Sequence, residues 1–199
     1  MNKKLAIIGA GGHGKVVGEI ALLNQYDTIN FFDDKISEIK NFPFRIVGNI
    51  ELLKKNLKNY DDFFVAIGDN VIRCDKISWL KKEKKNIVSL IHPKSTVSKF
   101  SSIEAGSCVM ANAAINAGTN IKEGVIINTS SSIDHDCSIE DYSHISPNCS
   151  LSGNVRVGKF THLGTGTSVH PRINIGQNVK TGIGSKIYKD ILNNKIFKN

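Results

Sequence analysis

The sequence predicts an α/β unit followed by a solenoid of short parallel β-strands. Two observations lead to this fold class. From Ile91 to Ile187 an aliphatic residue returns at every sixth position, and only Thr181 interrupts the series. Before this stretch, short apolar runs alternate with helical patterns, and a glycine-rich loop follows the first run. We therefore expect an α/β domain at residues 1–85 and a solenoid domain at residues 86–199.

The composition fits two modest domains without a membrane span. The chain has 199 residues, of which 40% are hydrophobic, enough for two ordinary cores. The first apolar run, at residues 5–8, is too short for a signal peptide or a membrane span. The four cysteines lack metal-ligand spacing, so we expect reduced core thiols, no metal and a cytoplasmic location.

The formal net charge of +8 comes largely from lysines scattered over predicted helix surfaces. Such charges usually form a solvated surface, and the other interpretation is attraction of small molecules that carry phosphate. The sequence lacks a basic surface interleaved with aromatic residues, so nucleic acid is not an expected partner.

In the first domain, predicted strands alternate with predicted helices. Apolar runs indicate buried strands, and stretches with spaced apolar residues indicate helices. The expected strands are residues 5–8, 30–32 and 62–67, and the expected helices are residues 15–23, 50–57 and 71–85. A further short strand, residues 87–91, is expected in the linker to the second domain.

The loop after the first strand, Gly9 to Gly14, has the composition of a phosphate cradle. Its glycines permit a tight turn and bring backbone N–H groups to an anion at a helix N-terminus, with Gly12, His13 and Gly14 nearest the helix. Asp33, followed by Asp34, is placed where a ribose-binding acid would be. The sequence therefore predicts a Rossmann-like nucleotide site, and the alternative is a glycine turn that only packs the helix on the strand.

A second glycine turn, at Gly68, ends the next strand of this domain. The carboxyl ends of parallel strands share one edge of the sheet, so the three loops can line the same crevice. A dinucleotide fold needs two such halves, and the six-residue repeat begins before a second could form. We therefore expect one nucleotide, and an NAD-linked oxidoreductase is disfavoured.

The six-residue period of the second domain is typical of a solenoid, because a short rung cannot bury its apolar residue alone. Three hexads make one coil of about 18 residues, so the stretch holds roughly five coils. A small or β-branched residue follows each aliphatic position four residues later, for example Cys137 after Ile133. Both positions are expected to point inward.

Chemistry is expected where His135 and Asp136 stand between the inward-facing Ile133 and Cys137. A carboxylate can orient an imidazole and raise its basicity, although a lone surface histidine is more often only solvated. Gly153 comes 18 residues after His135, so it should lie one coil away and present a backbone N–H that could bind a thioester oxygen. Cys137 is not expected to be a nucleophile because it faces the core.

These motifs, with the turn at residues 66–70 and the segment from Asn128 to Cys137, resemble the hexapeptide-repeat sugar acetyltransferases of the bacillosamine and perosamine type. The sialic acid O-acetyltransferases are a sister group. The resemblance covers nearly the whole chain. It implies a left-handed β-helix, a homotrimer with active sites between subunits, acetyl-CoA as cosubstrate, and a nucleotide-linked amino sugar in the first domain.

The resemblance also implies roles for individual residues. His135 would be the general base and Asp136 its orienting acid. Acetyl-CoA would be contacted by His144, Gly153, Thr165 and Ile183. The sugar nucleotide would be contacted by Gly12, His13, Gly14, Asp33, Asp34, Gly68 and Asn128, and Asn128 has a polar ladder between coils as its alternative role. The segment 191–199 departs from the family's usual end, which leaves coenzyme contacts there in doubt.

The predicted function is acetyl-CoA-dependent N-acetylation of the 4-amino group of a nucleotide-linked 4-amino-4,6-dideoxy sugar. The reaction would be a direct transfer that serves surface glycan synthesis, such as that of lipopolysaccharide. Two alternatives stay open: an O-acetyltransferase for sialic acid or a related sugar, and a nucleotide-sugar-binding scaffold without activity.

Overall fold

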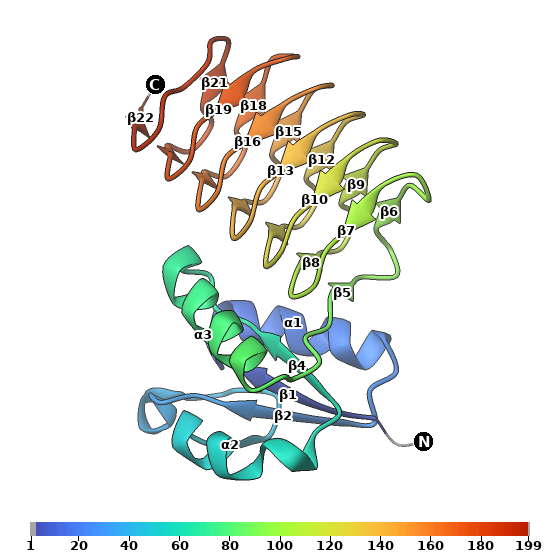
Figure 1. Cartoon of the computed structure of the whole chain (residues 1–199), viewed down its shortest axis with the longest axis vertical. Coiled ribbons are helices and arrows are strands. Elements are labelled where there is room, and N and C mark those ends of the chain that lie inside the picture. Colours follow the sequence, from blue (N-terminus) through green and yellow to red (C-terminus); the bar gives the residue numbers. More distant parts are fainter. Residues whose placement is uncertain (1–2, 199) are drawn as a thin grey trace. The chain divides into compact units, whose positions relative to one another are not determined.

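A computed structural model describes residues 3–198, and the chain divides into two compact units, Met1–Leu90 and Ile91–Asn199 (Figure 1). The domain boundary predicted at residues 85 and 86 therefore lies near the end of the first unit. No helix within residues 3–198 combines the length and the apolar character needed to cross a bilayer.

The first unit is a four-stranded parallel sheet with helices between its strands. The strands are β1 (Lys4–Ile8), β2 (Thr28–Phe32), β3 (Ile46–Gly48) and β4 (Asp62–Val65), and the helices are α1 (Gly12–Leu23), α2 (Ile50–Asn56) and α3 (Asn70–Lys82), with 3-10 turns at Ile36–Glu38 and Leu57–Asn59. The strand order is β3-β2-β1-β4. The chain therefore moves to one side of β1 and then to the other, which creates a topological switch point between β1 and β4.

Most predicted elements of the first unit are confirmed, with differences at their ends. The helix predicted from residue 15 begins at Gly12, so Gly12, His13 and Gly14 form its first turn. The extent of the strand predicted at residues 87–91 is wrong, because only its last two residues form a strand, β5 (Leu90–Ile91), and Ile87 makes a single bridge to Phe63. The edge strand β3 was not predicted, because its short run is only partly buried.

The second unit is a parallel β-helix of two-residue strands in three sheets (Figure 1). The seven-stranded sheet contains β5, β8 (Cys108–Val109), β11 (Ile126–Ile127), β14 (His144–Ile145), β17 (His162–Leu163), β20 (Lys180–Thr181) and β22 (Ile196–Phe197). The six-stranded sheet contains β6 (Thr96–Val97), β9 (Ala114–Ile115), β12 (Ser132–Ile133), β15 (Ser150–Leu151), β18 (Ser168–Val169) and β21 (Lys186–Ile187). The five-stranded sheet contains β7 (Ser102–Ile103), β10 (Asn120–Ile121), β13 (Ser138–Ile139), β16 (Arg156–Val157) and β19 (Asn174–Ile175).

The interior of the β-helix follows the predicted period. The aliphatic residues pack in one buried cluster, and the residues four positions later are buried as well from Ser107 to Ser185. Several of these small residues also join coils, because their side chains donate to a carbonyl on the following coil, as Thr119 Oγ1 does to Asp134 O at 2.6 Å. Thr181 fits this interior because its hydroxyl accepts a hydrogen bond from Gly164 N at 2.8 Å.

The three sheets meet at three corners, which are numbered here in chain order. Corner 1 follows the seven-stranded sheet and includes residues 128–131, 146–149, 164–167 and 182–185. Corner 2 follows the six-stranded sheet and includes residues 116–119, 134–137 and 152–155. Corner 3 follows the five-stranded sheet and includes residues 122–125 and 140–143. Equivalent corner positions are 18 residues apart and stack along the helix.

Candidate active site

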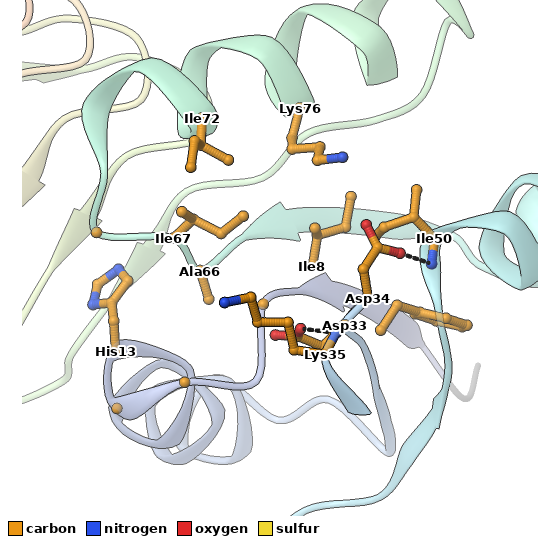
Figure 2. A pocket seen from close by; sticks show the side chains of 15 residues that line it. Ile8, His13, Asp33, Asp34, Lys35, Ile50, Ala66, Ile67, Ile72 and Lys76 are labelled. Carbon is orange, nitrogen blue, oxygen red and sulfur yellow. Dashed lines mark hydrogen bonds between the residues drawn. The ribbon is translucent and has the colours of Figure 1, made fainter. Parts of the chain in front are cut away.

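A cavity of about 620 Å³ opens at the carboxyl ends of β1, β2 and β4, where the three predicted loops meet (Figure 2). Its walls are mostly apolar, with a few polar groups at the rim. The lining residues are Ile8, Gly9, Gly11, Gly12, His13, Phe32, Asp33, Asp34, Lys35, Ile50, Ala66, Ile67, Gly68, Ile72 and Lys76. The volume and the position at the switch point suit a nucleotide-sized ligand.

The glycines of the first loop have different tasks. Gly9 has φ +104°, which favours glycine, and a Cβ on Gly14 would clash with Gly9 O, so these two shape the turn. Gly11, Gly12 and Gly68 line the pocket, and a Cβ on any of them would meet open space. Gly14 is not among the lining residues, and it packs closely against Gly9.

The two aspartates after β2 already hold backbone groups. Asp33 accepts from Ala10 N at 2.8 Å and from Lys35 N at 2.9 Å, and Asp34 accepts from Ile50 N at 3.0 Å. Asp33 therefore fastens the glycine loop to the end of β2, and Asp34 fastens the start of α2. Both side chains line the pocket, and a carboxylate can accept more hydrogen bonds than these, so a ligand contact is compatible with them.

His13 and two lysines supply the pocket's remaining polar side chains. Figure 2 shows His13 on α1, Lys35 after β2 and Lys76 on α3 around the same space. Desolvation by burial, and secondly the positive charge of Arg73, lower the pKa of His13 to about 4. His13 is therefore neutral at physiological pH, and the lysines bring the positive charge. The sequence interpretation missed both lysines, although Lys35 directly follows the predicted acids.

His135 lies on corner 2 with a defined orientation. Its Nδ1 is 2.8 Å from Asp136 Oδ2, and a carboxylate only accepts, so Nδ1 carries the proton and Nε2 is the basic nitrogen. The hydrogen bond to Asp136, and next the charge of Asp134, raise the pKa of His135. The ring is more than half exposed. The pair therefore presents a base with raised basicity toward solvent.

Gly118 and Asn116, which the sequence interpretation missed, help to fix the position of this pair. Asp136 has φ +59°, and a Cβ on Gly118 one coil away would clash with Asp136 Oδ1. Asp134 accepts from Asn116 Nδ2 at 2.9 Å and from His135 N at 2.8 Å, and these bonds, the Asn116 bond first, lower the pKa of Asp134. The spacing of 18 between Asn116 and Asp134 is the signal that could have found this ladder.

Gly153 lies where the 18-residue spacing predicted. A Cβ on Gly153 would come 2.5 Å from His135 Nε2 and 2.6 Å from Cε1, so only glycine lets the imidazole occupy this place. Within residues 3–198, the Gly153 N–H has no hydrogen-bond acceptor. Cys137 faces the interior as predicted, its Sγ lies 3.3 Å from Ser152 O, and burial raises the pKa of its thiol.

Asn128 and His144 contact each other on the seven-stranded side. Asn128 Oδ1 accepts from Thr129 N at 2.8 Å, which directs Nδ2 to His144 Nε2 at 3.2 Å. The amide donates, so His144 Nε2 is an acceptor and its Nδ1 carries the proton. The His144 ring also stacks on His162 with centroids 4.5 Å apart and planes 8° apart. In this chain Asn128 therefore orients His144.

The expected site residues of the β-helix form separate groups in one chain. His135, Asp136 and Gly153 are together on corner 2, whereas Thr165 and Ile183 are on corner 1, where Ile183 is 81% exposed. One side of a coil, six extended residues long, separates the corners by up to about 20 Å. His144 lies on the seven-stranded sheet beside corner 1, where Asn128 contacts it, and the filled interior separates it from corner 2. These groups do not face a common space within one chain.

A parallel β-helix of hexapeptide coils with an oriented imidazole at a corner is the arrangement of a hexapeptide-repeat acyltransferase. Residues 4–80 match the family described as the PglD N-terminal domain. The structure is similar to the acetyltransferase domain of PglB from Neisseria gonorrhoeae in complex with acetyl coenzyme A, with 40% identity, a TM-score of 0.95, and coverage of 100% of this chain and 97% of that chain.

It is also similar to GDP-perosamine N-acetyltransferase from Caulobacter crescentus, in a histidine-to-alanine mutant bound to CoA and GDP-perosamine, with 31% identity, a TM-score of 0.93, and coverage of 100% and 95% of the two chains. UDP-N-acetylbacillosamine N-acetyltransferase from Bacillus subtilis is 37% identical over 114 residues, which are 55% of this chain and about half, 52%, of that relative. The chain belongs to the family of acetyl-CoA-dependent nucleotide-amino-sugar N-acetyltransferases that these proteins represent. The resemblance inferred from the sequence motifs is thereby confirmed.

Proposed function

We propose that this protein transfers the acetyl group of acetyl-CoA to the 4-amino group of a nucleotide-linked 4-amino-4,6-dideoxy sugar. The observation that carries the proposal is the His135 corner. The imidazole is held by Asp136 through Nδ1, and its basic Nε2 lies over Gly153. A base in this state suits proton removal from an attacking amine. The similarity to a UDP-N-acetylbacillosamine N-acetyltransferase and to a GDP-perosamine N-acetyltransferase supports an amino sugar as the acceptor.

The proposed reaction is a direct transfer. The neutral amine attacks the thioester carbonyl, a C–N bond forms, and the C–S bond breaks as the thiolate leaves. His135 Nε2 takes the proton that the nitrogen loses and can return it to the sulfur. The Gly153 N–H would stabilise the charge on the carbonyl oxygen. General-base assistance of this kind contributes about 100- to 10,000-fold.

The nucleotide would occupy the pocket of the first unit. The open backbone at Gly11, Gly12 and Gly68 permits close approach of a phosphate, and Lys35 and Lys76 supply positive charge. His13, Asp33 and Asp34 would contact the sugar or the ribose from the rim. The apolar walls at Phe32, Ile50 and Ile72 would hold the base.

The assembly would be a homotrimer with its active sites between subunits. His144, Thr165 and Ile183 would contact the coenzyme from one chain while His135 and Gly153 act from its neighbour. This arrangement is supported by the separation of these residues over different corners and sheets. A cytoplasmic location, supported by the four free cysteines, and a role in surface glycan synthesis complete the proposal.

The test measures thiol release from acetyl-CoA with UDP-, GDP- and dTDP-linked 4-amino sugars, and with free and CMP-linked sialic acid. Wild type and His135→Ala are compared, and nucleotide binding is measured by calorimetry as a check on folding. We expect turnover on an amino sugar that falls by about 100- to 10,000-fold in His135→Ala, with nucleotide affinity unchanged.

The other outcomes separate the alternatives. Turnover only on sialic acid would establish an O-acetyltransferase. Tight nucleotide binding without turnover on any acceptor would establish a binding scaffold. Full activity in His135→Ala would refute the assigned base.

A further inference from the structure

Arg73 lies in the first turn of α3 and is fully buried, with 0% of its surface exposed. It is the largest side chain buried to this degree within residues 3–198. A guanidinium does not lose its proton in proteins, and its burial is costly unless hydrogen-bond acceptors are in place. A buried arginine beside a ligand pocket therefore calls for a specific reason.

The guanidinium holds the turn between β4 and α3. Nη1 donates to Ile67 O at 2.9 Å and to Gly68 O at 3.1 Å, and Nη2 donates to Asn70 Oδ1 at 2.8 Å. Two successive carbonyls are thus fixed toward one side chain. The same turn lines the nucleotide pocket through Ile67 and Gly68, whereas Arg73 itself is not among the lining residues.

Because the peptide bond is planar, these contacts also fix the direction of two backbone N–H donors. In a trans peptide the N–H points away from the C=O, so fixing Ile67 O and Gly68 O toward Arg73 directs the N–H groups of Gly68 and Asp69 to the opposite side. Within the described part of the chain, residues 3–198, neither N–H has an acceptor. A Cβ on Gly68 would meet open space, so a ligand can approach this backbone.

We propose that Arg73 is a positioning residue whose forked contacts set the Gly68 and Asp69 N–H groups as donors to an anionic oxygen of the nucleotide-linked substrate. The inference rests on the proposed function, because it needs a nucleotide in this pocket. Arginine suits the task better than lysine, since its rigid planar fork reaches two carbonyls and an amide at once. Successive backbone N–H groups in a turn form a concavity that favours anions.

The electrostatics of His13 agree with this arrangement. Arg73 is the second cause, after desolvation, of the lowered pKa of His13. The other charged groups around the pocket are Asp33, Asp34, Lys35 and Lys76. A neutral His13 can both donate to and accept from a sugar or phosphate oxygen. Removing the charge of Arg73 should raise the pKa of His13, which stays below its ordinary value because the desolvation persists.

The experiment compares the full-length wild type with Arg73→Lys, which keeps the charge but loses the fork, and with Arg73→Met, which loses both. Leu80→Ala is the matched control, because Leu80 is a fully buried residue of the same helix outside the pocket lining. Affinities for UDP, GDP and dTDP are measured by calorimetry, with KM for each substrate, kcat, and unfolding temperature. Asn70→Ala, which removes the acceptor of Nη2 and keeps Arg73, serves if the Arg73 variants do not fold.

We expect Arg73→Lys to weaken nucleotide binding about tenfold while kcat and the KM for acetyl-CoA change less than about twofold. Asn70→Ala should show a smaller loss in the same direction. Leu80→Ala should lose stability and keep its nucleotide affinity. An NMR titration of His13 should give a higher pKa in Arg73→Met than in wild type.

Wild-type nucleotide affinity in Arg73→Lys, or in Asn70→Ala if that variant replaces it, would overturn this inference and leave the proposed function standing. A loss of nucleotide affinity in Leu80→Ala as large as that in Arg73→Lys would also overturn it, because the loss would then follow from destabilisation of the helix. A wild-type chain that binds none of the three nucleotides would overturn the proposed function, and the inference with it.

Discussion

The proposed nucleotide pocket and the proposed acyl-transfer site differ in how much of each a single chain builds. The pocket is lined by three loops of one sheet edge, and its aspartates, glycines and Arg73 are held by hydrogen bonds within that unit. The residues proposed for acyl transfer are divided among two corners and a sheet surface of the β-helix. We therefore expect a single chain to bind the nucleotide by itself, whereas acetyl transfer should require the assembled subunits.

The sharpest test of this comparison is complementation between two inactive chains. His135→Ala and His144→Ala are each expected to have low activity alone. The activity of His135→Ala should be about 100- to 10,000-fold below that of wild type. They are co-expressed with different tags and purified by both. In a mixed cyclic trimer one site of three joins an intact His135 to an intact His144 of its neighbour, so about one third of wild-type activity should return.

A co-expressed pair that stays as inactive as its parents would show that each site lies within one chain. The double variant His135→Ala/His144→Ala, paired with wild type, is the control for assembly. Nucleotide affinity should be unchanged in every one of these proteins, since the pocket lies in the first unit.

Gly153→Ala should have the next largest effect. Its Cβ would come 2.5 Å from His135 Nε2, so the exposed ring must move away. A displacement of about 1 Å at a reacting group can cost roughly 100-fold, and kcat should fall by about that factor with little change in unfolding temperature. Ser152→Ala, at the neighbouring corner position, is the matched control. Wild-type kcat in Gly153→Ala would mean that the contact between ring and glycine is not used.

Asp136→Asn should have a smaller effect, and its sign is defined. His135 acts as a base only when neutral, so activity should rise with pH through its raised pKa. Losing the carboxylate lowers that pKa, which moves the acidic limb of the kcat/KM profile to lower pH and reduces the plateau by about tenfold. Asp134→Asn should move the limb in the same direction by less. A limb that stays in place in Asp136→Asn would assign it to another group.

The sequence was most informative where the structure repeats. Each coil makes the same demand on its inward residues, so Ile133 and Cys137 could be placed, and the 18-residue spacing brought Gly153 to His135. The β1 loop and the pocket at the switch point also followed from local pattern. These parts depend on contacts that recur at fixed intervals, or on short segments of the chain.

The remaining features depend on contacts with no fixed spacing. The sequence does not reveal that Asp33 accepts from Ala10, because that bond depends on the pairing of β1 with β2. The tie from Asn128 to His144 spans 16 residues, so it falls outside the coil period. Arg73 resembled an ordinary residue of a basic helix, and only its burial and its bonds to Ile67 and Gly68 distinguish it.

The stacking of equivalent corner positions has a consequence for how such an enzyme can diversify. The position of His135 is held by Lys99, Ala117, Gly153, Pro171 and Lys189 on the other coils. The turn is similar at Ala117, Gly153 and Pro171, where the next residue has a positive φ as Asp136 does, so a base could be held in a similar setting on several coils. The histidine and its aspartate could be moved by one coil, with one glycine 18 residues after the histidine and another 18 residues before the aspartate. This change would displace the reaction by about 4.8 Å and leave the rest of the scaffold unchanged.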